Sequence, residues 1–196
     1  RRQRQMCIRD RFIIQLIALS INGINPIVYM KKSLALLILA FTSRSSVGCL
    51  PVTIETLTQK LGVNQATASF VAGFGTTAGM QGCAGIFPSL LIVYVCHLTG
   101  TTMDFSMIVM TIIVVTLGSL GIAGIPGTAT MAASVGLSGV GMASSFSLIG
   151  PILAIDPLID MARTMLNVSG SVTNALIIDK RLGNLDENIY NEINKN

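Results

Sequence analysis

The chain has 196 residues, of which 51% are hydrophobic and only 11% charged, and its mean hydropathy is +0.70. This composition excludes an ordinary soluble domain, in which about a quarter of the residues are charged. The net charge of +4 arises in residues 1–11, because the other basic and acidic residues cancel, and this argues against a nucleic-acid-binding surface. From Leu61 to Ile155 the one charged residue is Asp104, so we expect the lipid bilayer to be the solvent.

Residues 1–11, RRQRQMCIRDR, are basic and unlike the sequence that follows, and the chain does not begin with Met. We expect them to be a non-native or disordered tip of an incomplete reading frame. The alternative is a native basic flank on the cytoplasmic side of a membrane. Residues 12–30 are interpreted as the remnant of a preceding transmembrane helix, about half the length needed to span, followed by a turn at NGINP.

Residues 31–62 predict a helical hairpin. After Lys32 only about eleven apolar residues precede the turn TSRSSVGCLPVT, whereas a helix that spans the bilayer needs about 20. Pro51 suits the first turn of a second short helix. An irregular tip is stable at membrane depth only where protein or water surrounds it. We therefore expect this hairpin to be re-entrant.

Two further glycine-rich interruptions follow along the chain. Residues 64–98 are expected to form a transmembrane helix broken at FGTTAGMQGCAG, because each glycine costs about 1 kcal/mol relative to alanine within a helix. Residues 103–137 are expected to form a second re-entrant hairpin, opened by Asp104 and divided at LGSLGIAGIPGT. Short hairpins followed by irregular helices are typical of secondary transporters with inverted repeats.

Residues 142–182 are predicted to form one long helix with a polar stripe, and residues 183–196 a polar, poorly ordered tail. At about 100° per residue, six polar side chains share one face of this helix. They are Asp156, Asp160, Arg163, Thr164, Asn167 and Ser171. Because an ionisable group at the bilayer centre costs about 2.5–3.5 kcal/mol, the charged members must face protein, water or a ligand. The stripe is therefore a candidate binding site.

The sequence offers little for catalysis or for a bound cofactor. The cysteines lack CxxC spacing, and we interpret them as buried small residues; they are Cys7, Cys49, Cys83 and Cys96. With His97 as the single histidine, we expect neither a metal cluster nor a Cys/His catalytic pair, and therefore no enzyme. The glycine-rich tips lack the GK[ST] spacing of a nucleotide-binding loop.

Four motifs match one family in order. TSRSSVGCLPVT, GMQGC, GIAGIPG and DPLIDMARTMLNVSG resemble the first hairpin tip, the broken seventh helix, the second hairpin tip and the eighth helix of the dicarboxylate/amino acid:cation symporters. The resemblance covers residues 31–182 and implies the glutamate-transporter fold, an all-α multispanning membrane protein, of which this chain is the transport-domain core. It further implies elevator-type transport in a bacterial cell membrane, contact with lipid, and a homotrimer when the N-terminal scaffold helices are present.

The resemblance implies substrate-binding roles along the stripe and at the hairpin tips. Asp160 matches the carboxylate that holds the substrate's ammonium group, Asn167 the amide on its carboxylate, and Arg163 the guanidinium that neutralises an acidic side chain. Thr164 matches a neighbouring hydroxyl, and Cys83 replaces a hydroxyl that helps to hold the acidic side chain. The positions at the hairpin tips are Ser45, Ser46, Gly124 and Ile125. The second hairpin, by the same resemblance, is the gate.

The chain departs from the family at the positions that couple transport to cations. Gly79, Gln81 and Cys83 replace Asn, Asp and Thr in the broken helix, and Ser171 replaces a second Asp low on the striped helix. By the same resemblance, Asn167 is also expected to take part in cation coupling. Hard cations prefer anionic oxygen ligands, so we expect weakened sodium sites and coupling to fewer Na⁺ ions or to a proton. One family site made mostly of backbone carbonyls remains; it matches Thr77, Ser119, Leu120 and Ile122.

L-cystine is the substrate that these features favour. Cys83 softens one end of the pocket, whereas Arg163 still calls for a distal carboxylate, and the GTTAGMQGCAG segment resembles the bacterial L-cystine carriers of the family. Two alternatives remain open. One is a sodium-coupled carrier of acidic or neutral amino acids, and the other is a non-transporting membrane fragment or interaction module.

Structural interpretations also remain for single residues. The charged stripe could be an internal ion pair that only fixes helix packing, and Ser45 with Ser46 could form a plain turn. Asp156 could orient Arg163, or it could cap a kink at Pro157. We interpret Arg44 as a structural or gating partner on the first hairpin rather than as a substrate ligand.

Overall fold

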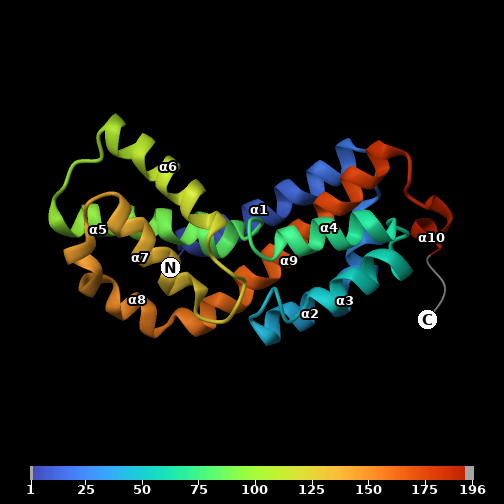
Figure 1. The fold of residues 1–196 in the computed structure, drawn as a ribbon, viewed down its shortest axis with the longest axis horizontal. Coiled ribbons are helices and arrows are strands. Elements are labelled where there is room, and N and C mark those ends of the chain that lie inside the picture. Colours follow the sequence, from blue (N-terminus) through green and yellow to red (C-terminus); the bar gives the residue numbers. More distant parts are fainter. Residues whose placement is uncertain (1, 193–196) are drawn as a thin grey trace.

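The computed structural model describes residues 2–192, with side chains from residue 9 onward. Within that part of the chain the regular secondary structure is entirely helical, and the elongated molecule has two lobes (Figure 1). One lobe contains α5 (Phe87–Thr99), α6 (Phe105–Leu120), α7 (Thr128–Gly139), η3 (Ala143–Ile149) and α8 (Gly150–Ala154). The other contains α1 (Arg2–Ile21), α2 (Pro26–Ser43), α3 (Leu50–Glu55), η1 (Thr56–Lys60), α4 (Gln65–Gly75) and α10 (Glu187–Asn191). The two lobes are joined by η2 (Gln81–Ile86) and α9 (Asp156–Leu182).

The first helical pair consists of α2 and the returning α3 and η1. α2 begins at Pro26 rather than at residue 31, because the Asn25 side chain accepts a hydrogen bond from the Ile27 amide and proline suits a first helical turn. α2 is 18 residues long and, by length and composition, apolar enough to cross a membrane. We expected this segment to be too short to cross a membrane, and that expectation was wrong, because α2 is long enough. That the pair is re-entrant stays a prediction.

The predicted break in the second long segment is present. α4 ends at Gly75 and η2 begins at Gln81, so the chain is non-helical over residues 76–80, in the middle of the glycine-rich motif. A Cβ atom on Gly79 would lie 2.7 Å from the Gly75 Cα atom, so the turn requires glycine at this point. Beyond the break, residues Gln81–Thr99 form a second stretch that is long and apolar enough to cross a membrane.

The second helical pair, α6 and α7, occupies the predicted range of 103–137, except that α7 continues two residues further to Gly139. The Asp104 side chain caps α6 by accepting a hydrogen bond from the Met107 amide at 2.8 Å, as its position at the start of the segment predicted. Residues 121–127 connect the two helices and end at Gly127, whose φ of 86° favours glycine.

The helix predicted over residues 142–182 is not continuous. η3 and α8 together bend by 84° relative to α9, and the bend lies at Ile155. Proline has no backbone N–H group, so it is tolerated only in the first turn of a helix. Pro151 and Pro157 occupy first-turn positions of α8 and α9, so each starts a new helix. The polar stripe therefore begins at the first residue of α9.

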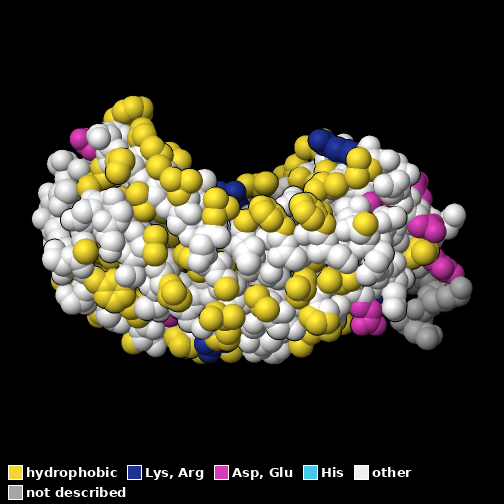
Figure 2. All heavy atoms as spheres, in the orientation of Figure 1, with side chains coloured by type: hydrophobic (Ala, Val, Ile, Leu, Met, Phe, Trp, Pro, Cys, Tyr) yellow, Lys and Arg dark blue, Asp and Glu magenta, His cyan; other side chains and the backbone are white. Residues whose placement is uncertain are grey.

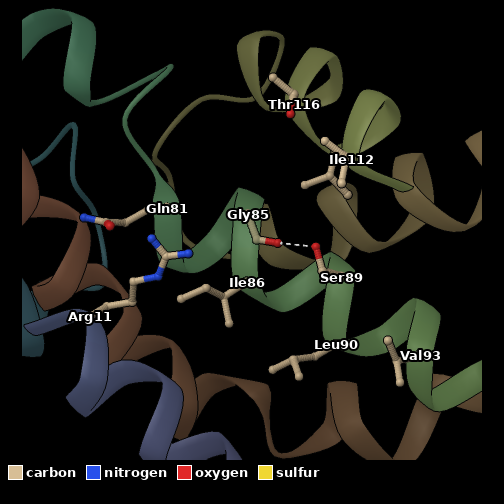
Figure 3. Close-up of a pocket in the computed structure, with 10 residues that line it drawn as sticks. Arg11, Gln81, Gly85, Ile86, Ser89, Leu90, Val93, Ile112 and Thr116 are labelled. Carbon is tan, nitrogen blue, oxygen red and sulfur yellow. Dashed lines mark hydrogen bonds between the residues drawn. The ribbon is translucent and has the colours of Figure 1, made fainter. Parts of the chain in front are cut away.

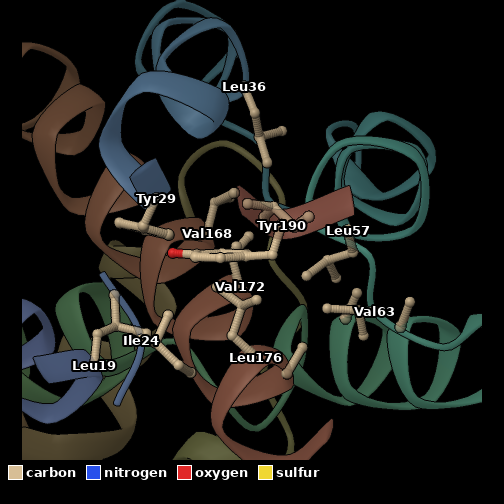
Figure 4. Packing of buried hydrophobic residues seen from close by; sticks show 14 of the residues in the cluster. Leu19, Ile24, Tyr29, Leu36, Leu57, Val63, Val168, Val172, Leu176 and Tyr190 are labelled. Carbon is tan, nitrogen blue, oxygen red and sulfur yellow. The ribbon is translucent and has the colours of Figure 1, made fainter. Parts of the chain in front are cut away.

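α9, which joins the two lobes, packs against α1, α2, α4 and η2. The largest apolar cluster gathers around its C-terminal half, where Val168, Val172 and Leu176 meet Tyr29 of α2 and Leu57 of η1 (Figure 4). The polar residues of the N-terminal half of α9 instead face η2. The packing thus holds the stripe at the junction between the lobes.

Much of the molecular surface is apolar. Large hydrophobic side chains are exposed along α6, including Ile112, Leu117 and Leu120, and acidic side chains on the face in Figure 2 lie mainly near the two ends of the molecule. A soluble protein rarely exposes so much contiguous apolar surface, whereas a bilayer solvates it. The surface fits a membrane protein.

Helices occupy both ends of the described part of the chain. α1 runs back to Arg2, so residues 2–11 are helical rather than disordered, and whether they are native stays a prediction. The tail contains α10, in which Tyr190 is 3% exposed and donates its hydroxyl hydrogen to the Asn25 carbonyl at 2.9 Å. Burial raises the pKa of Tyr190, which keeps its hydroxyl a donor. Residues 193–196 lie outside the described part.

Candidate functional site

The polar stripe of α9 is buried along its whole length. Its members are between 1% and 7% exposed, and they are Asp156, Asp160, Arg163, Thr164, Asn167 and Ser171. The helical repeat places them on one face, and η2 and Arg44 at the tip of the first helical pair contact that face. Buried charges and amides of this kind require partners, and those partners define the site.

Arg163 is the centre of the buried ion pairs. Its Nη2 atom lies 2.6 Å from Asp156 Oδ1 and 3.3 Å from Asp160 Oδ1, and its guanidinium group lies over the Phe87 ring, 4.1 Å from the ring centroid. The Nε and Nη1 atoms of the same group are buried without a hydrogen-bond partner. A guanidinium group carries five N–H donors, so Arg163 has capacity for a further acceptor.

Arg44 brings a second cation to Asp160. Its Nε atom lies 3.5 Å from Asp160 Oδ2, opposite the oxygen that faces Arg163. Arg44 ends α2 in a left-handed backbone conformation with a φ of 55°, which is uncommon for a residue other than glycine. It lies at the tip of the first helical pair. The cluster of Arg44, Arg163, Asp156 and Asp160 has no formal net charge.

η2 is fastened to the stripe through Asn167 and Cys83. The Gly82 amide donates to Asn167 Oδ1 at 2.8 Å, and Asn167 Nδ2 donates to Cys83 Sγ at 3.1 Å. Cys83 Sγ in turn lies 3.6 Å from Asp160 Oδ1. A Cβ atom on Gly82 would lie 3.1 Å from the Arg163 carbonyl oxygen, so glycine allows this close approach. Three predicted substrate residues therefore lie in direct contact.

The tips of the two helical pairs meet the broken helix at Gly124. The Gly124 carbonyl accepts hydrogen bonds from the Val47 amide at 3.1 Å and from Ser45 Oγ at 3.2 Å. The Gly124 amide donates to the Thr76 carbonyl at 3.0 Å. A Cβ atom on Gly124 would lie 2.7 Å from Thr76 O and 2.9 Å from Ser46 Cβ, so the three segments touch through backbone atoms.

Two predicted substrate residues are placed differently from the others. Thr164 is buried on α9, one helical turn beyond Asp160. Ile125 is adjacent to Gly124, but its side chain is 51% exposed, and its amide bonds to Thr128 Oγ1 at 3.2 Å rather than facing the stripe. If Ile125 binds substrate as predicted, it would do so through its backbone atoms.

The predicted cation-coupling residues divide into two groups. Gly79, Gln81 and Ser119 line one cavity of about 320 Å³, together with Asn174 of α9. Ser171 packs against Gly75 and donates to the Asn167 carbonyl at 3.2 Å. The remaining predicted residues do not line this cavity: Thr77 and Leu120 are exposed, and Ile122 is buried in a cluster with Met80 and Ala84, which do line it.

Gln81 also borders a larger open cavity of about 440 Å³ between α1, α5 and α6. Figure 3 shows the Arg11 guanidinium group directed toward η2 near Gln81, while Ile86, Leu90 and Val93 supply an apolar wall. The side-chain amide of Gln81 packs on Gly170, where the amide of Gln15 also approaches. Neutral amides thus crowd the position that the family fills with a carboxylate.

Sequence reasoning missed several residues of this cluster. It assigned Arg44 no contact with Asp160, and it did not consider Phe87, Gln15 or Asn174. The signal for Arg44 was present, since it is the one charged residue in its turn. Phe87 and Gln15 gave no signal, because their contacts with α9 depend on how distant segments pack.

Comparisons with known proteins identify the family of the chain. A sequence model described as the sodium:dicarboxylate symporter family matches residues 7–181. The "L-cystine uptake protein TcyP" of Bacillus cereus is 43% identical over 182 residues, 92% of this chain and 39% of the relative. Those of Bacillus licheniformis and Shouchella clausii are 42% and 41% identical, with 92% and 94% of this chain and 39% of each relative covered. The chain spans about two fifths of the length of these relatives, and it belongs to the sodium:dicarboxylate symporter family.

Proposed function

We propose that the chain is the transport-domain core of a secondary active transporter that takes up L-cystine across a bacterial cell membrane. The observation that carries the proposal is the guanidinium group of Arg163, 2% exposed for the residue as a whole, whose Nε and Nη1 atoms lack a protein partner. Together with Asp160 and Asn167 it offers cation and anion ligands within one buried cluster. Each end of L-cystine carries one ammonium and one carboxylate group, which match these ligands.

The geometry suggests how binding would proceed. Asp160 is held by Arg44 and Arg163, and Asn167 is held by η2, so the charged groups satisfy one another. A substrate ammonium group would replace Arg44 at Asp160, and a substrate carboxylate would accept from the unpartnered donors of Arg163. Because Arg44 belongs to the first tip and Gly124 to the second, this exchange would loosen both tips.

The names of the relatives support L-cystine over the alternatives, and the rest of the proposal follows from the family. We propose that the two helical pairs are re-entrant hairpins, that the core moves in elevator fashion, and that the full-length protein is a homotrimer in lipid. The neutral amide of Gln81 and the hydroxyl of Ser171 favour coupling to a proton or to fewer sodium ions.

Equilibrium binding to the purified chain in detergent tests the proposed substrate. Radiolabelled L-cystine should bind one equivalent per chain, and unlabelled L-cystine should compete better than L-aspartate or L-serine. Tighter binding of L-aspartate would favour the alternative of an acidic amino acid carrier. An absence of binding by a folded chain, with helical content intact by circular dichroism, would favour the non-transporting alternative.

A further inference from the structure

Three sulfur atoms converge at the end of the lobe remote from the polar stripe. Cys96 Sγ lies 3.5 Å from Met107 Sδ and 3.9 Å from Met142 Sδ. The three residues come from α5, from the first turn of α6 and from the position before η3. Cys96 is 2% exposed and Met142 is 9% exposed, both within the apolar cluster of this lobe.

The spacing of the sulfur atoms around Cys96 suits a shared metal ion. A metal–thiolate bond is about 2.3 Å long, so three sulfur atoms in a trigonal plane around one ion lie about 4.0 Å apart. The separation of 3.9 Å between Cys96 Sγ and Met142 Sδ nearly equals this value. The separation of 3.5 Å between Cys96 Sγ and Met107 Sδ is about half an ångström too short, and the flexible side chain of Met107 can move outward by that amount.

The chemistry of the three ligands selects a soft, monovalent ion. Thiolate and thioether sulfur prefer Cu(I), whereas carboxylate and carbonyl oxygen prefer harder ions. A monovalent ion bound to one thiolate is neutral, which an apolar cluster tolerates, while a divalent ion would leave a buried positive charge. In the part of the chain that the structure describes, no group of three His, Cys, Asp or Glu side chains is placed to hold a metal.

The local fold positions the ligands and gives access to them. The Asp104 cap orients the first turn of α6, which carries Met107, and the Met142 amide donates to the Leu137 carbonyl at 2.7 Å. An open cavity of about 390 Å³ reaches Cys96 between Val93, His97 and Met103. An ion can therefore approach the thiol from one side while the thioethers face it from others.

We propose that Cys96, Met107 and Met142 bind one soft monovalent metal ion, Cu(I) or its analogue Ag(I). On binding, a bond forms between the metal and Cys96 Sγ, and the thiol proton passes to solvent. The two methionine thioethers complete a trigonal site without a change of charge. The inference does not depend on the proposed transport of L-cystine, because the site shares no residue with the polar stripe.

Competitive titration tests the site. The full chain, purified in detergent with Cys7, Cys49 and Cys83 replaced by Ser, is titrated anaerobically with Cu(I) against a chromogenic Cu(I) chelator. One ion should bind per chain, and Cys96→Ser should abolish the binding. Met107→Leu or Met142→Leu should each weaken it by at least about tenfold, the scale of loss even for outer ligand partners in metal sites.

The controls separate ligation from folding. Leucine nearly conserves the volume of methionine, and Met110→Leu, on the exposed face of α6, should leave the Cu(I) affinity unchanged. Ag(I) should raise the unfolding temperature of the Cys96-only protein but not of its Met107→Leu/Met142→Leu derivative. Equal Cu(I) affinity with and without both methionines, or Zn(II) binding as tight as Cu(I) binding, would overturn the proposal.

Discussion

Arg163 combines two properties that seldom occur together in one buried side chain. It is paired with Asp156 and Asp160 through a single nitrogen, and its other two nitrogens have no hydrogen-bond partner, although the group lies over the Phe87 ring. A purely structural ion pair would be expected to use the full planar fork of the guanidinium group. The residual donors are therefore the feature that distinguishes a ligand site from a packing device at this position.

Arg163→Lys tests that distinction. Lysine keeps the charge for Asp156 and Asp160 but removes the planar fork, so we expect L-cystine affinity to fall by at least tenfold, about 1.4 kcal/mol. Helical content should be retained. Arg181→Lys on the same helix, where the arginine donates to Asn22 near the surface, is the matched control and should bind L-cystine normally. Unchanged affinity in Arg163→Lys would assign this arginine to packing alone.

Gly124 allows its own segment to lie against the segments that contain Ser46 and Thr76. Gly124→Ala would bring a Cβ atom against Thr76 O and Ser46 Cβ, and we expect the overpacked tip to lower the free energy of unfolding by about 1–3 kcal/mol. Thermal unfolding followed by circular dichroism measures this loss. Gly85→Ala is the control, because a Cβ atom there meets nothing within 4 Å. Equal unfolding temperatures for the two variants would mean that the tips do not rest on one another.

At the scale of elements, the two connecting segments and the broken helix form a single junction over α9. Much of this could be predicted from sequence, because glycine-rich breaks and the polar stripe are local patterns. The bend at Ile155 could have been inferred from Pro151 and Pro157, but the apolar character of the segment outweighed that signal. The lone charge in the first turn marked Arg44 as a candidate, but its contact with Asp160 could not be predicted, since that contact depends on the left-handed end of α2.

The docking of α10 against the rest of the molecule could not be predicted from the composition of the tail. The tail is polar overall, yet one aromatic ring anchors it in the core beside α2. Lys32 also donates to the Lys60 and Ile189 carbonyls, so α2, η1 and α10 share one set of hydrogen bonds. These few contacts therefore hold the polar segment α10 in an ordered helix.

Tyr190→Phe measures the strength of that docking. Phenylalanine keeps the buried ring but loses the hydrogen bond to the Asn25 carbonyl, so we expect a loss of about 0.5–1.5 kcal/mol in the free energy of unfolding. Tyr94→Phe is the control, because the Tyr94 hydroxyl makes no hydrogen bond within residues 2–192. Faster proteolysis of the tail in Tyr190→Phe alone would agree with the account, and identical stability of the two variants would contradict it.

At the scale of the whole molecule, the residues proposed to couple cations carry less charge than the residues proposed to bind substrate. Gln81 and Ser171 carry no charge, whereas Arg44 and three residues of α9 form a balanced ionic cluster. The three are Asp156, Asp160 and Arg163, and they lie about two to four helical turns before Ser171. A transporter built on this core would bind a charged substrate while offering few anionic oxygen ligands to sodium. The proposal of reduced sodium dependence belongs to this scale.

Replacing Na⁺ by choline tests that proposal. Uptake by a transporter with this core should persist without Na⁺ and should rise as external pH falls, because a proton gradient would then drive it. Gln81→Asp adds an anionic oxygen ligand beside the cavity of Gly79 and Ser119, and we expect it to make uptake depend on Na⁺. Loss of all uptake without Na⁺ at every pH would rule out coupling to protons alone.

The most direct test of the central claim is uptake of radiolabelled L-cystine into proteoliposomes. The matching C-terminal region of the Bacillus cereus relative is replaced by residues 12–182 of this chain, so that the core works within a full-length protein. The account predicts concentrative L-cystine uptake that excess L-aspartate does not inhibit and that Arg163→Lys impairs. Preferential uptake of L-aspartate, or L-cystine uptake indifferent to Arg163→Lys, would contradict it.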